Sequence, residues 1–400
     1  MAIITSRYER PLYATSSQKL AIGLVPVSYV LLASGSISPF FINVTLGIIF
    51  PTFILTIFAV LFRSQIFRYI LVKSTLHLFP ILTALLIATF QTQDLFYAYY
   101  KIDGAILATI SVAPLMIYSA NIIGVQAFVK FFIFTCVIVL VFTIIYKLHF
   151  GFWDRSVRFF INGPIIFGWM MSIAALMCLY MNKNSGSFVY VFLFIIFLSS
   201  VLWTASKGPL IALIISSSLF FIRINLRVVS SILFIFAFMT ITYNIIETIG
   251  EGVVENTLSR LSVIGRIIDN NLEDGDFGSV IIRMEMISIS MSVFLDNPLF
   301  GVGLGNWSFY SGLDSNMLYP HNVVMEILAE TGIFGAIIIF SSFLYLWIRA
   351  ESLGKLLAAM LLMEMSASGD MSYFRIPLSF LLLFAYSQHY RVTRDFVSST

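Results

Sequence analysis

Long apolar runs, separated by short polar segments, repeat along the whole chain. The runs extend over about 15 to 24 residues, the length that an α-helix needs to cross a hydrocarbon layer of about 30 Å. They lack the alternation of apolar and polar residues typical of a membrane β-barrel, and a helix satisfies its own backbone groups in lipid. The pattern predicts an all-α, polytopic integral membrane protein with about twelve transmembrane helices.

Composition agrees with this class, because 59% of the 400 residues are hydrophobic and only 11% are charged. A lipid bilayer is therefore the expected surroundings of the protein. The predicted spans cover residues 20–35, 40–62, 77–92, 104–121, 128–146, 164–181, 187–203, 208–222, 228–246, 332–349, 354–369 and 376–390.

The distribution of Lys and Arg predicts the orientation of these spans. If the N-terminus is cytoplasmic, 14 of the 23 Lys and Arg residues lie on the cytoplasmic side, together with only three acidic residues. Short cytoplasmic loops of membrane proteins carry such an excess of basic residues. We therefore expect both termini to be cytoplasmic.

One connection is much longer than the others and lies on the outer side. Residues 247–331 contain twelve acidic residues but only three basic ones, and apolar residues recur within them at helical spacing. These repeats predict amphipathic helices that lie on the membrane or fold back over it. The chain thus divides into an N-terminal bundle of about nine spans (1–246), a large outer loop that carries the site (247–331), and C-terminal helices with a short cytoplasmic tail (332–400).

A glycine-rich segment, DNPLFGVGLGNW, occupies residues 296–307 of this loop. Gly301, Gly303 and Gly305 permit positive φ angles and a close approach of backbone. Direct contact with a phosphate is one interpretation. A structural turn is favoured, because the spacing is not that of a dinucleotide-binding loop and no βαβ unit surrounds it.

The loop ends in a polar segment, PHNVVMEILAE, at residues 320–330. Pro320 is typical of a helix start, and Asn322, Glu326 and Glu330 follow at intervals of four residues on one helical stripe. His321 is the only histidine of the large loop. A histidine at a helix start is usually a plain surface residue, but here its surroundings also favour a catalytic base.

Several cations are predicted on the outer side, against the general bias. They are Arg155, Arg158, Lys207, Arg283 and Arg375. Phosphate groups of a lipid-linked substrate would explain them, because Arg binds phosphate through two parallel hydrogen bonds and Lys binds it as a point charge. Pairing of Arg155 with Asp154, and of Arg375 with Asp370, explains those two equally well.

These motifs, in this order, resemble the O-antigen polymerase and O-antigen ligase superfamily of bacterial envelope polysaccharide assembly. The likeness is strongest over residues 283–335, with weaker similarity in RFFINGPIIFG (158–168) and TASKGPLIAL (204–213). The resemblance implies a fold similar to the C-type glycosyltransferases, in the bacterial inner membrane, with the large loop in the periplasm. It implies an undecaprenyl-diphosphate-linked oligosaccharide as donor and a chain-length regulator as a candidate partner. No metal, other cofactor or nucleic acid is implied.

The resemblance also implies roles for particular residues. His321 corresponds to the base that activates the acceptor, and Arg283 to the cation that holds the diphosphate. Lys207 stands where the family usually has Arg, so the charge is kept but the bidentate geometry is lost. Arg155, Arg158, Asn322, Glu326 and Arg375 are further candidates for substrate binding.

Three functions remain open at this stage. The H-N-x-x-x-E pattern, with Glu326, modestly favours a polymerase that joins repeat units. A ligase that transfers the glycan to lipid A-core shares every motif named above. A transporter or flippase of lipid-linked glycan is the alternative from another class, but such proteins usually gather polar groups near the membrane midplane.

Overall fold

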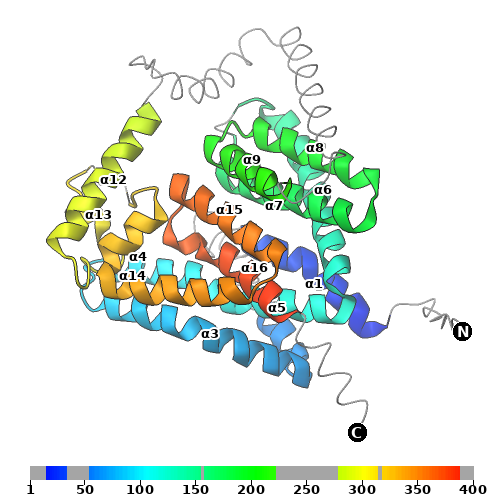
Figure 1. Cartoon of the computed structure of the whole chain (residues 1–400), viewed down its shortest axis with the longest axis horizontal. Coiled ribbons are helices and arrows are strands. Elements are labelled where there is room, and N and C mark those ends of the chain that lie inside the picture. Colours follow the sequence, from blue (N-terminus) through cyan, green and yellow to red (C-terminus); the bar gives the residue numbers. More distant parts are fainter. Residues whose placement is uncertain (1–14, 34–53, 155–156, 222–277, 314–317, 388–400) are drawn as a thin grey trace, which may run out of the picture.

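The computed structural model describes residues 15–33, 54–154, 157–221, 278–313 and 318–387. Throughout these ranges the regular structure is helical, with no β-strand. In addition to a helix over residues 54–61, the elements are α1 (Ser16–Ala33), α3 (Gln65–Thr89), α4 (Leu95–Ile102), the π-helix η1 (Asp103–Leu107), α5 (Ala108–Ile123), α6 (Val125–Phe150), α7 (Pro164–Ser185), α8 (Phe188–Trp203), α9 (Lys207–Phe221), α12 (Gly278–Asp296), α13 (Trp307–Tyr310), α14 (Val323–Arg349), α15 (Ser352–Ser368), the 3-10 helix η2 (Met371–Phe374) and α16 (Arg375–Tyr386) (Figure 1).

The predicted membrane class is confirmed, because six helices within the described residues are long and apolar enough to cross a membrane. They are Ser16–Ala33, Gln65–Thr89, Leu95–Ile123, Val125–Phe150, Pro164–Ser185 and Val323–Arg349. Shorter apolar helices cover Phe188–Trp203, Lys207–Phe220 and Met371–Tyr386. The predicted span 228–246 and most of span 40–62 lie outside the described residues.

The helices α3 and α4 begin well before the predicted spans to which they belong. The span expected at 77–92 belongs to α3, which starts at Gln65 behind the N-cap Ser64. The span expected at 104–121 continues a helix that starts at Leu95, where the carboxylate of Asp94 accepts a hydrogen bond from Tyr97 N at 2.9 Å. Lys101 falls between the predicted spans 77–92 and 104–121, whereas the folded chain buries its side chain completely.

The glycine-rich segment forms a structural turn that packs against a kink in α14. Gly332 interrupts this helix with φ 62° and ψ −170°, a conformation almost restricted to glycine. Val302 N donates to Ala329 O at 2.9 Å, and Gly303 N donates to Glu330 O at 3.1 Å. Because these amides already have carbonyl partners, the alternative of a phosphate-binding loop is wrong for them.

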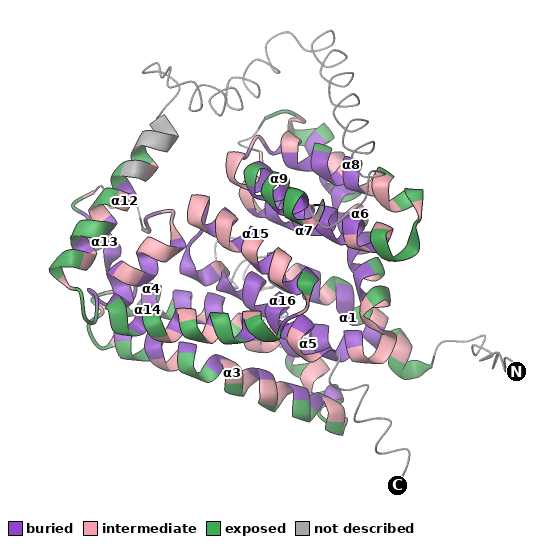
Figure 2. Ribbon diagram, in the orientation of Figure 1, coloured by how far each residue is buried: buried purple, intermediate pink, exposed green. Residues whose placement is uncertain are grey.

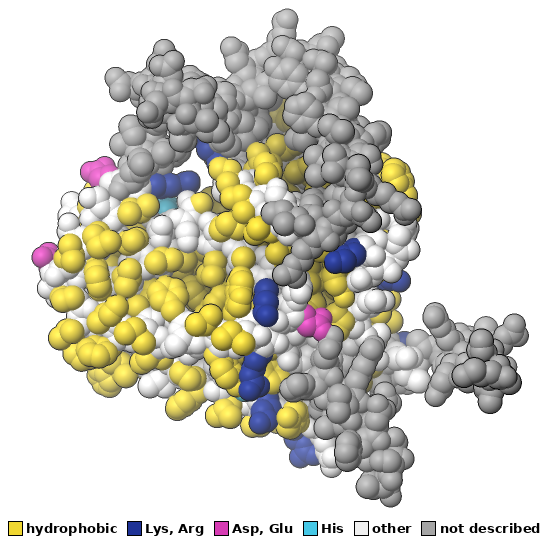
Figure 3. All heavy atoms as spheres, in the orientation of Figure 1, with side chains coloured by type: hydrophobic (Ala, Val, Ile, Leu, Met, Phe, Trp, Pro, Cys, Tyr) yellow, Lys and Arg dark blue, Asp and Glu magenta, His cyan; other side chains and the backbone are white. Residues whose placement is uncertain are grey.

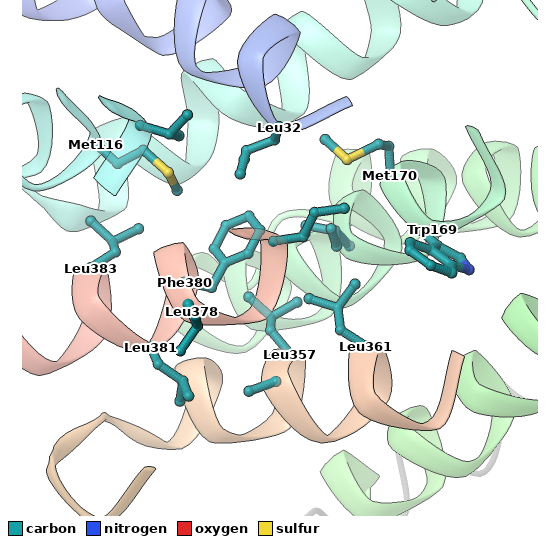
Figure 4. Close-up of a cluster of buried hydrophobic side chains, with 14 of the residues drawn as sticks. Leu32, Met116, Trp169, Met170, Leu357, Leu361, Leu378, Phe380, Leu381 and Leu383 are labelled. Atoms are coloured by element: carbon teal, nitrogen blue, oxygen red, sulfur yellow. The ribbon is translucent and has the colours of Figure 1, made fainter. Parts of the chain in front are cut away.

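One hydrophobic core joins helices from both ends of the chain. Figure 4 shows Leu32 of α1, Met116 of α5 and Met170 of α7 converging with Leu361 of α15 on Phe380 of α16. Every Ile, Leu and Phe side chain from Ile376 to Phe384 in α16 is at most 1% exposed, so this part of the helix is buried all round. In Figure 2 the buried residues concentrate around α16, α5 and α7, whereas exposed residues mark the outer faces of α3 and α14.

We predict that Gly332→Ala destabilises the protein. An added Cβ would lie 2.4 Å from Leu299 O, and the backbone angles alone cost on the order of 1–3 kcal/mol for a residue with a side chain. The midpoint of thermal unfolding in detergent should fall clearly. Gly23→Ala is the matched control, because a Cβ at Gly23 of α1 meets nothing within 4 Å. An unchanged midpoint for Gly332→Ala would contradict the close packing of the kink.

Candidate active site

Residues from distant parts of the sequence meet at the end of the bundle where α14 begins. Arg283 of α12 donates a hydrogen bond through Nη2 to the hydroxyl of Ser368, the last residue of α15, at 3.4 Å. His321 precedes α14 and is influenced electrostatically by both Arg283 and Asp370. In Figure 3, dark-blue basic side chains and a cyan histidine meet between α12 and the upper end of α15, on a face that is otherwise largely hydrophobic. The predicted catalytic pair is therefore brought together.

His321 has an unusual backbone and an unusual ring environment. Its φ of 55° is rare for a residue other than glycine, and such strain is characteristic of functional sites. The Tyr319 ring lies 4.4 Å from the imidazole, centroid to centroid. Nδ1 is buried and has no hydrogen-bond partner among the described residues, although buried polar atoms are usually satisfied.

The surroundings of His321 keep its imidazole neutral near pH 7. Burial lowers the pKa of His321 from its ordinary value of 6.5, and the Arg283 cation lowers it further, whereas Asp370 opposes both. Burial also lowers the pKa of Arg283, with Tyr319 opposing, but an arginine remains charged. A neutral imidazole near a partly desolvated guanidinium is the result.

Asp370 is a site residue that sequence reasoning treated only as a partner for Arg375. It is 4% exposed, and its Oδ1 accepts hydrogen bonds from the backbone N–H of Ser372 at 2.7 Å and from the hydroxyl of the same residue. These bonds fix the carboxylate at the start of η2, where its charge acts on His321. Its position could not be inferred from the sequence, because 48 residues separate it from His321.

Asn322 and Glu326 hold the start of α14 in place. The side-chain oxygen of Asn322 caps the helix, because it accepts hydrogen bonds from Val324 N and Met325 N at 3.1 Å each. Glu326 is fully buried, and its Oε2 accepts a hydrogen bond from Met371 N at 2.8 Å. Asn322 directly follows His321 in the chain and Glu326 lies one turn further on, but these contacts of both residues are with the protein backbone.

Shortly after His321 in the chain, two buried carboxylates are paired with one buried ammonium group. Lys101 Nζ lies 2.6 Å from Glu326 Oε1, 2.6 Å from Glu330 Oε1 and 2.7 Å from Glu330 Oε2. All three side chains are 0% exposed. Glu330 also accepts the backbone N–H of Trp307 at 3.4 Å, which links the network to α13.

Sequence reasoning missed Lys101, although a signal for it was present. Two glutamates on one stripe of an apolar helix require a cation, because buried carboxylates without a partner are very costly. Lys101 was placed on the same outer side as these glutamates, at the start of a long apolar run. The pairing across 229 positions is nevertheless a tertiary contact that no local pattern specifies.

Lys207 lies near the same end of the bundle. It is the first residue of α9 and is half-buried. The next residue, Gly208, lies close to Ala367 of α15, because a Cβ added to Gly208 would lie 3.1 Å from the Cβ of Ala367. Ala367 directly precedes Ser368, whose hydroxyl accepts the hydrogen bond from Arg283. The preceding Ala205 has a φ of 49°, a second strained residue beside this region.

The other predicted cations lie in different positions. Arg375 is fully buried and donates to Leu32 O at 3.1 Å and to Ser372 O at 2.8 Å, so it ties the end of α1 to η2. Arg158 is exposed on the loop after α6, where the neighbouring Phe159 packs against Trp203 with ring centroids 5.1 Å apart. Arg155 lies outside the described residues. In the described part of the chain, no three His, Cys, Asp or Glu side chains are grouped to hold a metal ion.

A comparison with protein families tests the resemblance that the sequence motifs indicate. Residues 192–340, a little over a third of the chain, match the sequence model of a family described as O-antigen ligase. The matched range includes Lys207, Arg283, His321 and Glu326. The match confirms the resemblance to the O-antigen polymerase and ligase superfamily. No curated protein matches the chain.

We predict that Lys101→Met severely reduces the amount of folded protein. Removing one partner of a buried ionic network leaves uncompensated charge and costs about 3–5 kcal/mol. Expression and thermal unfolding in detergent measure the effect.

The matched control is the triple variant Lys101→Met/Glu326→Gln/Glu330→Gln, which removes every charge of the network. It should unfold at a higher temperature than Lys101→Met alone. A single Lys101→Met variant as stable as the natural protein would contradict the ionic network.

Proposed function

From the match to the O-antigen ligase family, we propose that this chain is a membrane glycosyltransferase that uses a glycan linked to undecaprenyl diphosphate. The observation that carries the proposal is the meeting of Arg283 and His321, from two separate segments, at one end of the bundle. A glycosyl diphosphate already contains a good leaving group. The enzyme therefore needs a cation for the departing charge and a base for the acceptor hydroxyl.

Arg283 is the proposed cation for the diphosphate. Its guanidinium is held by Ser368 and partly withdrawn from water, which strengthens its interaction with an anion. Lys207, at the start of α9, is a second cation for the same group. Arg155 and Arg158, on the loop after α6, remain candidates for contact with the substrate outside this centre.

His321 is the proposed base. The oxygen of the acceptor hydroxyl forms a bond to the anomeric carbon, while the bond from that carbon to the diphosphate oxygen breaks. The hydroxyl proton passes to the imidazole, and the diphosphate stays on its lipid carrier. Asp370 stabilises the imidazolium that results, because its carboxylate favours the protonated ring.

The contacts of the three other buried or helix-capping candidates support a role in positioning the site residues. Asn322 caps the helix that follows His321, and Glu326 belongs to the buried network with Lys101. Arg375 is fully buried among backbone carbonyls. We therefore assign Asn322, Glu326 and Arg375 to holding the site, in place of the substrate-binding role that the sequence predicts for them.

We further propose that the site faces the periplasm, in a bacterial inner-membrane protein of about twelve spans with cytoplasmic termini. The excess of Lys and Arg in the loops on the side opposite the site supports this orientation, because such loops are usually cytoplasmic. A chain-length regulator is a candidate partner of this reaction.

Polymerase activity is our first proposal for the acceptor step, on the strength of the H-N-x-x-x-E pattern. Transfer to lipid A-core is the second candidate, because the match to the family described as O-antigen ligase is compatible with either activity. A transporter is disfavoured, because the site residues gather at one end of the bundle.

Deletion of the gene distinguishes the two enzymes when lipopolysaccharide is separated on a gel. Loss of a polymerase leaves a single repeat unit on the core. Loss of a ligase leaves bare core, with glycan retained on the lipid carrier.

We predict that His321→Ala and Arg283→Ala each abolish long-glycan display while the protein remains inserted. Loss of a general base lowers the rate about 10²–10⁴-fold, and loss of a charge-stabilising group has a similar effect. Gel ladders report the product, and immunoblots of membranes report the protein.

His149→Ala is the matched control for His321→Ala, because His149 is an exposed histidine at the end of α6. Arg283→Lys keeps the charge but loses the bidentate geometry and should retain partial activity. Normal ladders in the two alanine variants would remove the catalytic assignment.

We also predict how transfer activity depends on pH. A base must be unprotonated, and the pKa of His321 lies below 6.5, so activity should persist to pH values below 6.5 and fall only under more acidic conditions. In Arg283→Gln the neighbouring cation is lost, the pKa of His321 rises, and the acidic limb of the residual activity should move to higher pH. Rates across a pH series with purified protein test this. An acidic limb that stays in place in Arg283→Gln would refute the coupling.

A further inference from the structure

A second cluster of polar side chains lies at the other end of the bundle, away from the candidate active site. Tyr69, Lys73 and His77 follow one another at intervals of four residues on α3, and Tyr345 and Arg349 do so on α14. Because α14 begins beside His321 and has 27 residues, its far end lies roughly 40 Å from the site. Figure 3 shows a row of dark-blue side chains that runs down across the right-hand ends of α14 and α3.

The cluster is held together by specific contacts between three helices. His77 Nδ1 lies 2.6 Å from Lys73 O, a carbonyl that can only accept, so Nδ1 carries the proton and donates. In the neutral ring Nε2 then accepts the hydroxyl of Tyr386, from α16, at 2.6 Å. The Tyr345 ring stacks on the same imidazole, with centroids 5.5 Å apart.

The cations of this cluster lie against aromatic rings. Arg349 lies 4.6 Å from the centroid of the Tyr345 ring, and Lys73 lies 5.7 Å from that of Tyr69. The sequences of α3, of α16 and of α14 after Gly332 contain no Asp or Glu. Glu351, which follows α14, is near enough to Tyr180 of α7 to interact with it. The cluster thus presents positive charge for which its own helices supply no carboxylate.

Apolar side chains continue from the cluster along the outer surface. Val72 and Leu76 of α3 are 65% and 60% exposed, and Leu344 and Ile348 of α14 are 55% and 66% exposed. In a membrane protein such side chains face acyl chains, and cations next to them lie at the level of the headgroups. A ligand with an anionic head and two hydrocarbon tails matches this surface in both charge and polarity.

We propose that Lys73, His77, Tyr345, Arg349 and Tyr386 form a binding site for the phosphate headgroup of an anionic phospholipid. Arg349 and Lys73 bind the phosphate oxygens. The acyl chains lie along the apolar side chains of α3 and α14. The lipid holds α3, α14 and α16 together at the end of the bundle remote from the catalytic centre.

Native mass spectrometry of the purified full-length protein in detergent tests this proposal. Phosphatidylglycerol and phosphatidylcholine with identical acyl chains are the two probes. The natural protein should bind phosphatidylglycerol at least fivefold more tightly than phosphatidylcholine. Equal affinity for the two lipids, or complete competition by inorganic phosphate at the same concentration, would overturn the lipid site.

The double variant Lys73→Gln/Arg349→Gln should lose this preference. Its matched control is Lys130→Gln/Lys183→Gln, which removes two exposed cations from α6 and α7 and should keep it. The single variant Arg349→Lys retains the charge and should show an intermediate preference, which separates loss of the site from loss of the fold. An unaltered preference in the Lys73→Gln/Arg349→Gln variant would also overturn the proposal.

Discussion

The structure depends on one buried ionic network, in which the ammonium of Lys101 lies between the carboxylates of Glu326 and Glu330. Withdrawing an ammonium group and its partner carboxylates from water is costly, and the cost is offset only when the partners meet in good geometry with further hydrogen bonds. Here the carboxylates also accept the backbone N–H groups of Met371 and Trp307. Any displacement of α4 from α14 would leave charge buried without a partner, so the network strongly restricts their relative position.

This restriction extends to the candidate site through short, rigid connections. Glu326 lies one turn into the helix that Asn322 caps, directly after His321. The backbone N–H of Met371 donates a hydrogen bond to Glu326. Met371 directly follows Asp370, whose charge acts on His321. The glycine turn fixes the other side, because its backbone amides bond to carbonyls at the kink of α14. The strained backbone of the histidine persists because the surrounding structure determines its position on both sides.

The two ends of the bundle use positive charge in different ways. Near α12, Arg283 is partly withdrawn from water and lowers the pKa of His321, an arrangement suited to a reaction that moves a proton and releases an anion. In the first half of α3 and at the end of α14, Lys73 and Arg349 lie on aromatic rings beside exposed apolar side chains. That arrangement suits a lasting contact with lipid, because the imidazole of His77 is already engaged there by Lys73 O and by the hydroxyl of Tyr386.

The sequence by itself determined the helical membrane class, the glycine turn and the helix start that follows His321. Hydrophobic run length, glycine conformation and helix-start chemistry are local properties of the chain. Arg283 and His321 were identified through a resemblance that the family match supports. Only the tertiary structure decided that Lys101 belongs inside the protein, that Asp370 acts on His321, and that Glu326 and Arg375 are buried among protein partners. These features depend on which helices touch, and a charge is tolerated in the interior only when a distant part of the chain supplies its partner.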